Sequence, residues 1–364
     1  MNILLHGRFQ PPHKGHLALI KYILKKYKKS RLIISLDVRE KDVLNPFSFS
    51  FRKRIFQEEL KFFQKRIIIT KHRCHRLTYK GCLLPTYENA KKFGKIDLVI
   101  GGPDLPEEVK NLWHRKGIKV ETVKKRFFDL SATELRLLLK KKNLGFSIIT
   151  NFGCRNHCWY CIWRNFHLLK NKLTSVESTD WKKLEELIKW YPGKKINVSG
   201  GLEPLFNYQQ NKKWWNRLFK IAKKHKKLID VHTRELLFKK DLLANVNKLV
   251  ISFDGLSEFR QIKNQLIKYA ARRVKIRLVK VITAKTKLNE LEEIIDFSNR
   301  YHFQITFKQL YGFNDQGNFN KLRKKLNKIY DFEKYKIRFL KQGDYNVYFM
   351  PDNKLYETFI LLHL

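Results

Sequence analysis

The apolar residues of this chain follow two kinds of pattern: segments with helical periodicity and short continuous runs. Blocks with helical periodicity lie at residues 17–24, 180–191 and 289–300. Short apolar runs predict buried strands at residues 2–5, 31–36, 66–69, 97–100, 146–150, 195–199, 228–232, 248–253, 274–281 and 303–308. Strands that alternate with helices predict an α/β protein with parallel sheets, in which ligands bind at the carboxyl ends of the strands.

The same pattern divides the 364 residues into two domains. A helical pattern ends near Leu138 and runs into the basic segment 140–142, after which strands and helices alternate afresh. We therefore expect a Rossmann-like parallel-sheet domain over residues 1–142. A second domain over residues 143–364 should be built from six βα units, and each domain is large enough to bury its own core.

Composition and charge leave the class of partner open. Apolar residues make up 43% of the sequence, which indicates globular domains. The formal net charge is +44, and such a charge should attract polyanions such as RNA, DNA or nucleotides. The lysines are spread along the whole chain, so a lysine-rich composition without a functional surface explains the charge as well. No signal peptide or membrane-spanning run is expected, and clustered cysteines fit a reduced cytoplasm better than a disulfide scaffold.

Three cysteines follow the predicted strand 146–150 with the spacing C-x-x-x-C-x-x-C. They are Cys154, Cys158 and Cys161, on a segment that opens with the strand-breaking residues 151–153. Thiolates are soft ligands that suit iron–sulfur clusters or zinc, and three of them can hold three irons of a cubane while the fourth stays open. The alternative is a zinc site with His157 as fourth ligand. Zinc sites usually combine a C-x-x-C pair with a second, distant pair of ligands, and no such pair follows in this sequence.

This cysteine stretch, with Tyr160 before the last thiol, resembles the radical S-adenosylmethionine (SAM) enzymes. The resemblance implies a partial (βα)6 barrel and a [4Fe-4S] cluster whose open iron binds SAM. It also implies an electron donor such as flavodoxin or ferredoxin, and cleavage of SAM to a 5′-deoxyadenosyl radical. Residues 198–204 resemble the family's GGEP motif with Leu202 inserted, which implies that Gly200, Gly201 and Glu203 contact the SAM amino group. The family also implies that Ser252 and Arg277 contact SAM. For both residues a purely structural role is an equally open alternative.

A second chemical signal follows the first predicted strand. Residues 6–16 are rich in glycine, proline and histidine, and a helical pattern begins directly after them. A strand, a turn and a helix start together form a phosphate site, because free amides and the helix dipole favour anions. His13 and His16 bracket Lys14-Gly15 and can both face that site.

This stretch resembles the HxGH motif of the nucleotidylyltransferases, and its longer string is similar to archaeal-type nicotinamide-mononucleotide (NMN) adenylyltransferases. The resemblance implies ATP and Mg²⁺ as ligands, with His13 and His16 stabilising the charge of the reacting phosphates. The residues that it implies for nucleotide or phosphate binding are Arg8, Phe9, Gln10, Asn45, Arg52, Ser131, Thr133 and Arg136.

Two departures from that family leave the acceptor open. Residues 101–104 replace the usual Ser-Gly-Asn, and residues 72–90 lack the stretch expected to shape a nicotinamide pocket. His72, Cys74 and His75 in this segment indicate either a metal site or a polar loop.

The sequence thus predicts a bifunctional enzyme that acts on small nucleotide substrates. It would join adenylyl transfer, with NMN as the acceptor, to radical SAM chemistry on an unknown substrate. The alternatives are a nucleic-acid-modifying radical SAM protein and an amino-terminal domain that only binds nucleotide.

Overall fold

The computed structural model resolves the chain into two compact units. The amino unit is Met1–Lys140 and the carboxyl unit is Lys141–Leu364. Residues that the structure describes are 1–38, 47–74, 79–102, 105–123, 132–140, 145–156, 158, 161, 179–200, 202–237, 239–271, 274–310, 316–341, 346–350 and 352–356.

The amino unit is built on a five-stranded sheet in the order β3-β2-β1-β4-β5, in which every pairing is parallel. Its elements are β1 (Asn2–Gly7), α1 (Lys14–Lys26), β2 (Arg31–Asp37), α2 (Phe49–Glu59), the 3-10 helix η1 (Lys61–Arg66), β3 (Ile67–His72), α3 (Tyr79–Lys91), β4 (Leu98–Gly101), α4 (Glu107–His114), β5 (Lys119–Thr122) and α5 (Ala132–Lys140). The Rossmann-like fold class is confirmed. Strand β5 was not predicted, because its sequence Lys-Val-Glu-Thr holds a single apolar residue.

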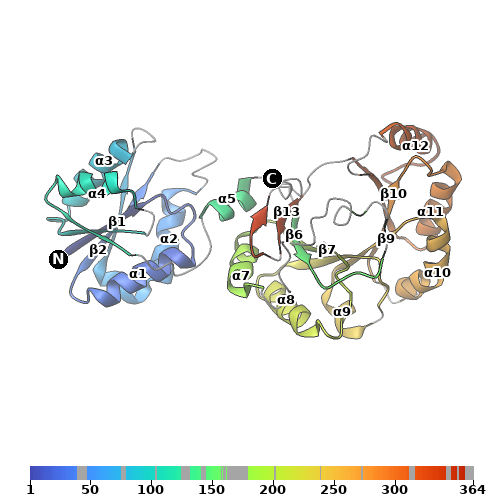
Figure 1. Ribbon diagram of the computed structural model, residues 1–364, viewed down its shortest axis with the longest axis horizontal. Coiled ribbons are helices and arrows are strands. Elements are labelled where there is room, and N and C mark those ends of the chain that lie inside the picture. The colour runs from blue at the N-terminus through green and yellow to red at the C-terminus, as the bar shows by residue number, and fades with distance from the viewer. Residues whose placement is uncertain are drawn as a thin grey trace. The chain divides into compact units, whose positions relative to one another are not determined.

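Alternate residues of each central strand enter two different cores. Ile3 and Leu5 of β1 pack with α1 and α2, whereas Leu4 packs with Trp113 of α4 and with residues of α3. Figure 1 shows α1 and α2 on one face of the sheet and α3 and α4 on the other. Because both faces are covered, the strands read as continuous apolar runs.

The carboxyl unit carries a nine-stranded sheet in the order β12-β11-β10-β9-β8-β7-β6-β13-β14. Its elements are β6 (Gly145–Thr150), α7 (Trp181–Trp190), β7 (Lys195–Gly200), α8 (Lys212–Lys224), β8 (Leu228–Thr233), α9 (Lys240–Asn245), β9 (Lys248–Phe253), α10 (Leu256–Ala271), β10 (Ile276–Ile282), α11 (Leu288–Arg300), β11 (Gln304–Gln309), α12 (Gln316–Ile329), β12 (Ile337–Leu340), β13 (Asn346–Phe349) and β14 (Leu355–Tyr356).

Strands β6 to β12 follow one another in chain order, and each is parallel to the next. This is the repeated βα arrangement of the expected partial barrel, with β12 as a further strand, and the helices lie outside the strands (Figure 1). On the other side of β6 the chain returns as β13, parallel to β6, and β14 then pairs antiparallel with β13. No helix in the part of the chain that the structure describes is long and apolar enough to cross a membrane.

Candidate functional site

The first candidate site lies where β1 ends and α1 begins. His13 is the N-cap of α1, and its Nδ1 accepts a hydrogen bond from the Gly15 amide at 3.2 Å. His16 Nδ1 accepts in turn from the His13 amide at 3.4 Å, and the two rings lie 3.8 Å apart between centroids. Since both Nδ1 atoms accept, the proton of each neutral ring is on Nε2, where it is available to a ligand.

Burial keeps both imidazoles neutral. It lowers the pKa of His13 to about 4, and it lowers the pKa of His16 well below its ordinary value, to which the charge of His13 adds. At neutral pH the pair therefore offers two N–H donors without positive charge. Any charge compensation for a bound anion must come from other groups.

Two arginines bring positive charge to this loop. Arg136 of α5 is nearly buried, and its Nη1 donates to the main-chain oxygen of Gln10 at 3.1 Å. Burial, followed by the charge of Arg8, lowers the pKa of Arg136. Two guanidinium groups that repel each other across one loop favour an anion between them.

Other residues predicted to bind nucleotide hold this loop in place. The Gln10 side chain pairs with both the amide and the carbonyl of Phe47, at 2.9 and 3.0 Å. Arg52 is fully buried and donates to the main-chain oxygens of Arg8 at 2.6 Å and Asp37 at 2.8 Å. Phe9 has a positive φ of 47° and packs edge-on against His16 at 4.8 Å. Their ligand contacts remain predictions, and the structure gives each a role in positioning the loop.

Some predicted residues of this site cannot be placed. Asn45 and Ser131 lie outside the described residues, and Thr133 is described only as part of the first turn of α5.

The second candidate site lies on the loop that follows β6. Gly153 has a φ of +113°, and its carbonyl accepts from the Glu203 amide at 2.9 Å. Cys154 Sγ accepts from the Asn156 amide at 3.4 Å, and the Cys161 amide donates to the Cys158 carbonyl at 3.1 Å. All three thiols are free and half-buried, so they are available as ligands.

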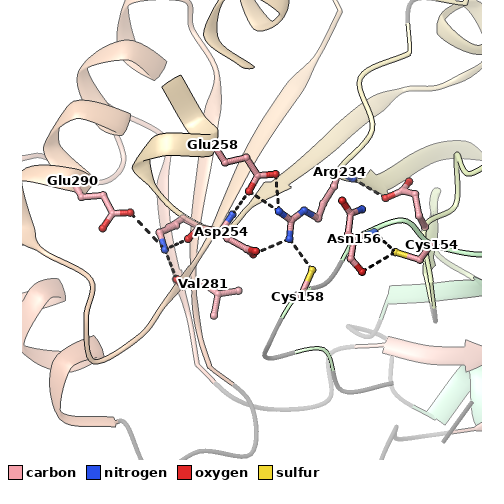
Figure 2. A network of polar contacts seen from close by, with 10 residues as sticks. Cys154, Asn156, Cys158, Arg234, Asp254, Glu258, Val281 and Glu290 are labelled. Atoms are coloured by element: carbon pink, nitrogen blue, oxygen red, sulfur yellow. Dashed lines mark hydrogen bonds and ion pairs between the residues drawn. The ribbon is translucent and has the colours of Figure 1, made fainter. Parts of the chain in front are cut away.

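Arg234, just beyond the end of β8, lies against one of these thiols (Figure 2). Its Nη1 is 2.7 Å from Cys158 Sγ and 2.8 Å from Asp254 Oδ1, and its Nη2 donates to both oxygens of Glu258 at 2.6 and 2.5 Å. Burial alone lowers the pKa of Arg234, but the two carboxylates outweigh it and raise the pKa. The guanidinium therefore stays charged and is held rigidly against Cys158.

The carboxylates are fixed in their turn. The Asp254 amide donates to Glu258 Oε2 at 2.7 Å. Lys280, which is buried, donates to the main-chain oxygens of Asp254 and Val281 and lies 3.6 Å from Glu290 (Figure 2). Lys280 thus ties the end of β9 to β10 and to the first turn of α11.

Glu203 is almost completely buried, with 4% of its surface exposed. Its carboxylate accepts from the Thr233 hydroxyl at 2.5 Å and from the amides of Arg234 at 2.9 Å and Leu205 at 3.0 Å. Burial raises the pKa of Glu203 to about 7, against the effect of these hydrogen bonds. Glu203 therefore sets the backbone from which Arg234 reaches Cys158.

The remaining predicted SAM contacts lie as follows. Gly200 ends β7, and Ser252 is next to last in β9, paired with Val279. Arg277 is the second residue of β10 and donates to Gln304 Oε1 at 3.1 Å, toward the opposite end of the strands. Tyr160, Gly201 and the alternative ligand His157 lie outside the described residues.

The donor set of this loop fits an iron–sulfur cluster. Three free thiols on one loop are the soft ligands that iron–sulfur chemistry requires, and the adjacent Arg234 offsets the negative charge that bound thiolates carry.

Sequence reasoning missed two features. Arg234 and Asp254 each follow a strand by one residue, and Glu258 lies in the first turn of α10; none of the three carries a motif, and the fold alone brings them together. Cys74 and Cys82 are joined by a disulfide bond, which the sequence interpretation did not foresee. Of the other two residues of the suggested metal site, His72 is buried with its Nδ1 2.8 Å from the Ser35 hydroxyl, and His75 lies outside the described residues.

Comparisons with known proteins concern mainly the amino unit. Residues 4–150 match the family model described as cytidylyltransferase-like. A probable nicotinate-nucleotide adenylyltransferase of Nitratiruptor sp. is 30% identical over 166 residues, which cover 38% of this chain and 88% of that protein. The nicotinamide-nucleotide adenylyltransferase of Sulfurisphaera tokodaii is 35% identical over 63 residues, 17% of this chain and 37% of that protein. The match spans 35% of an uncharacterized Archaeoglobus fulgidus protein, so the chain covers little more than a third of two of these three relatives.

Among solved structures, Streptococcus suis SuiB bound to S-adenosylmethionine is 13% identical, with a TM-score of 0.46. The alignment covers 79% of this chain and 75% of that chain.

Proposed function

The chain belongs, through residues 4–150, to the cytidylyltransferase-like family, and on this premise we propose that its amino unit transfers an adenylyl group from ATP to a phosphate-bearing acceptor. NMN is the acceptor that the sequence resemblance favours, and the products would be NAD and pyrophosphate. The observation that carries this proposal is the adjacent pair His13 and His16, each of which uses its Nδ1 as an acceptor and so presents Nε2–H to a phosphate.

The reaction needs no covalent intermediate. A phosphate oxygen of the acceptor attacks the α-phosphorus of ATP, the bond from that phosphorus to the oxygen that bridges it to the β-phosphorus breaks, and pyrophosphate leaves. Mg²⁺, when bound, would supply further positive charge to the phosphates. His13 and His16 donate to the phosphate oxygens on which charge develops, while Arg8 and Arg136 supply positive charge. Donors of this kind each contribute on the order of a hundred- to a thousandfold in rate.

NAD and pyrophosphate formation from ATP, Mg²⁺ and NMN tests this proposal. The His13→Ala, His16→Ala double variant should lose turnover by at least about a hundredfold. A matched control is His114→Ala, since His114 is exposed at the end of α4. Full turnover in the double variant would refute the assigned site. Bound ATP without any NAD would redirect the search to other phosphorylated acceptors.

For the carboxyl unit we infer radical SAM chemistry. Cys154, Cys158 and Cys161 would hold a [4Fe-4S] cluster, which, when bound, supplies the electron that cleaves SAM to an organic radical. The protein's own contribution is to present the three thiols on a loop fixed by Gly153 and Glu203. Arg234 places a positive charge beside Cys158. The carrying observation is this set of three free thiols at the end of β6.

Anaerobic reconstitution separates the two activities. The wild-type chain should bind four irons per chain and form 5′-deoxyadenosine from SAM with a chemical reductant. The Cys158→Ala variant should lose both while it keeps NAD formation, and the histidine double variant should show the reverse. Retention of the cluster signal by Cys158→Ala would contradict the ligand assignment. A flavodoxin- or ferredoxin-type donor, RNA or DNA partners and the cytoplasmic location remain predictions from sequence.

A further inference from the structure

Three chemically active side chains meet at the carboxyl edge of the amino unit's sheet, and one of them, Cys74, belongs to the segment that the sequence had suggested as a metal site or a polar loop. Asp37 is the last residue of β2, Cys74 follows β3 by two residues, and Cys82 lies in the first turns of α3. Asp37 and His72 are register partners on neighbouring strands, so the strand ends bring the carboxylate and the segment of Cys74 together. One donor atom from each of Asp37, Cys74 and Cys82 lies within 4.8 Å of the other two.

The two sulfurs are bonded to each other in this structure, and the Cα atoms of Cys74 and Cys82 are 4.3 Å apart. A disulfide bond alone does not require a carboxylate beside it. Asp37 nevertheless faces the pair with only 1% of its surface exposed, and Cys74 is 5% exposed. Cys82 is half-buried. Two sulfurs and one carboxylate oxygen held this close together are the donor set of a thiophilic divalent cation.

We propose that Asp37, Cys74 and Cys82, once the disulfide is reduced, form a binding site for one zinc-class divalent cation. Reduction by a thiol reductant breaks the S–S bond and adds two electrons and two protons, which yields two thiols and the oxidised reductant. Binding of the cation then releases the two thiol protons, because the ligands are thiolates. Three protein donors leave a fourth position of the tetrahedron open to water or another ligand.

The site is connected to the loop that carries His13 and His16. The main-chain oxygen of Asp37 accepts from Arg52 Nη2, and Nη1 of the same guanidinium donates to the main-chain oxygen of Arg8. Cys82 also fixes the start of α3 relative to the end of β3, within the segment whose sequence departs from the nicotinamide-pocket pattern. The cation would thus brace the edge of the sheet on which the proposed adenylyl-transfer site is built.

Zinc itself is the probe, and the full-length chain is the material. We compare the wild type with the Cys74→Ser, Cys82→Ser double variant. Both proteins are reduced anaerobically, freed of reductant and equilibrated with zinc. After gel filtration, the zinc bound to each protein is measured by elemental analysis. Because the cysteine triplet is intact in both, we expect one more zinc per chain in the wild type. Equal zinc in the two proteins would overturn the proposal.

Cobalt(II) and thiol counting test the same site without reliance on the fold of the double variant. Cobalt added to reduced wild type should give thiolate-to-cobalt absorption, and Asp37→Asn should weaken cobalt binding at least tenfold. The control Glu88→Gln, which changes an exposed carboxylate of α3, should leave cobalt binding unchanged. In wild type, zinc should protect two more thiols from a chromogenic disulfide reagent than the triplet alone accounts for. A disulfide that no reductant opens in the folded chain, or thiols that react equally with and without zinc, would refute the site.

Discussion

Replacement of Glu203 by glutamine tests whether this buried carboxyl group governs how the stability of the carboxyl unit depends on pH. Burial raises the pKa of Glu203 from 4.5 to about 7 in the folded chain. Between these two values the folded state binds more protons than the unfolded state, so stability falls as pH rises. The ionisation of buried Glu203 does not destabilise the fold below pH 4.5, and its destabilising effect is complete above pH 7. The pKa difference of about 2.5 units then corresponds to a loss of roughly 3 kcal/mol in the free energy of unfolding, at about 1.4 kcal/mol per unit.

Glutamine cannot ionise, so Glu203→Gln removes this dependence. At pH 5 the variant should be less stable than the wild type, because its amide cannot accept from all three donors at Thr233, Arg234 and Leu205. As pH rises to 8, the variant should gain about 2 to 3 kcal/mol relative to the wild type. At high pH the deficit therefore shrinks or reverses.

Hydrogen exchange measured by mass spectrometry reads the carboxyl unit separately from the amino unit. The ratio of exchange rates between variant and wild type in peptides from β7 and β8 cancels the intrinsic effect of pH. That ratio should fall by about thirty- to 150-fold from pH 5 to pH 8, since each 1.4 kcal/mol of the 2 to 3 kcal/mol change is about a factor of ten. Glu333→Gln, at an exposed carboxylate, is the control and should give a flat ratio. A flat ratio for Glu203→Gln as well would refute the reasoning.

Two further predictions concern the cysteine loop. Gly153→Ala should lower the iron bound per chain after reconstitution, because φ is +113° and a Cβ would lie 2.5 Å from the Phe206 ring. Gly255→Ala, where a Cβ meets nothing within 4 Å, should retain wild-type iron, and equal losses in the two variants would contradict this account. Arg234→Met should reduce the free energy of unfolding of the carboxyl unit by about 1–3 kcal/mol, because it leaves the carboxylates of Asp254 and Glu258, which are 36% and 29% exposed, without their cation. Addition of Glu258→Gln should restore part of the loss in the same exchange assay, and a strictly additive double variant would argue against the ion pair.

Much of the fold is readable from the sequence because buried parallel strands leave long apolar runs. The strand predicted at 274–281 is found at Ile276–Ile282, and the helix predicted at 289–300 is found at Leu288–Arg300. Two strands escaped prediction: β5, which holds a single apolar residue, and β12, a four-residue strand at the edge of the sheet. Pairing of β13 with β6 depends on contacts across the whole carboxyl unit, which no local pattern encodes.

The residues of the candidate sites also differ in how far the sequence alone reveals them. His13, His16 and the cysteine triplet are close in sequence, so their spacing alone indicates their chemistry. Arg234 is one of 77 lysines and arginines, and nothing in its neighbours distinguishes it. Its importance appears only when the end of β8 is placed beside Cys158. The bridge between Cys74 and Cys82 likewise depends on how β3 and α3 meet.

The pairing of β6 with β13 also bears on how the chain is made. Asn346 is the register partner of Gly145, and the two lie about two hundred positions apart in the sequence. A ribosome delivers the chain from its amino end. Once β6 and β7 have been synthesised, the amino unit is complete, but β6 has only β7 as a neighbour because β13 has not yet been made. We therefore expect the cysteine loop to reach its final form only after residues 346–349 have left the ribosome. A nascent chain stalled before residue 346 would carry a finished amino unit and an incomplete sheet beside the thiols, so it should bind less iron than a chain that includes β13.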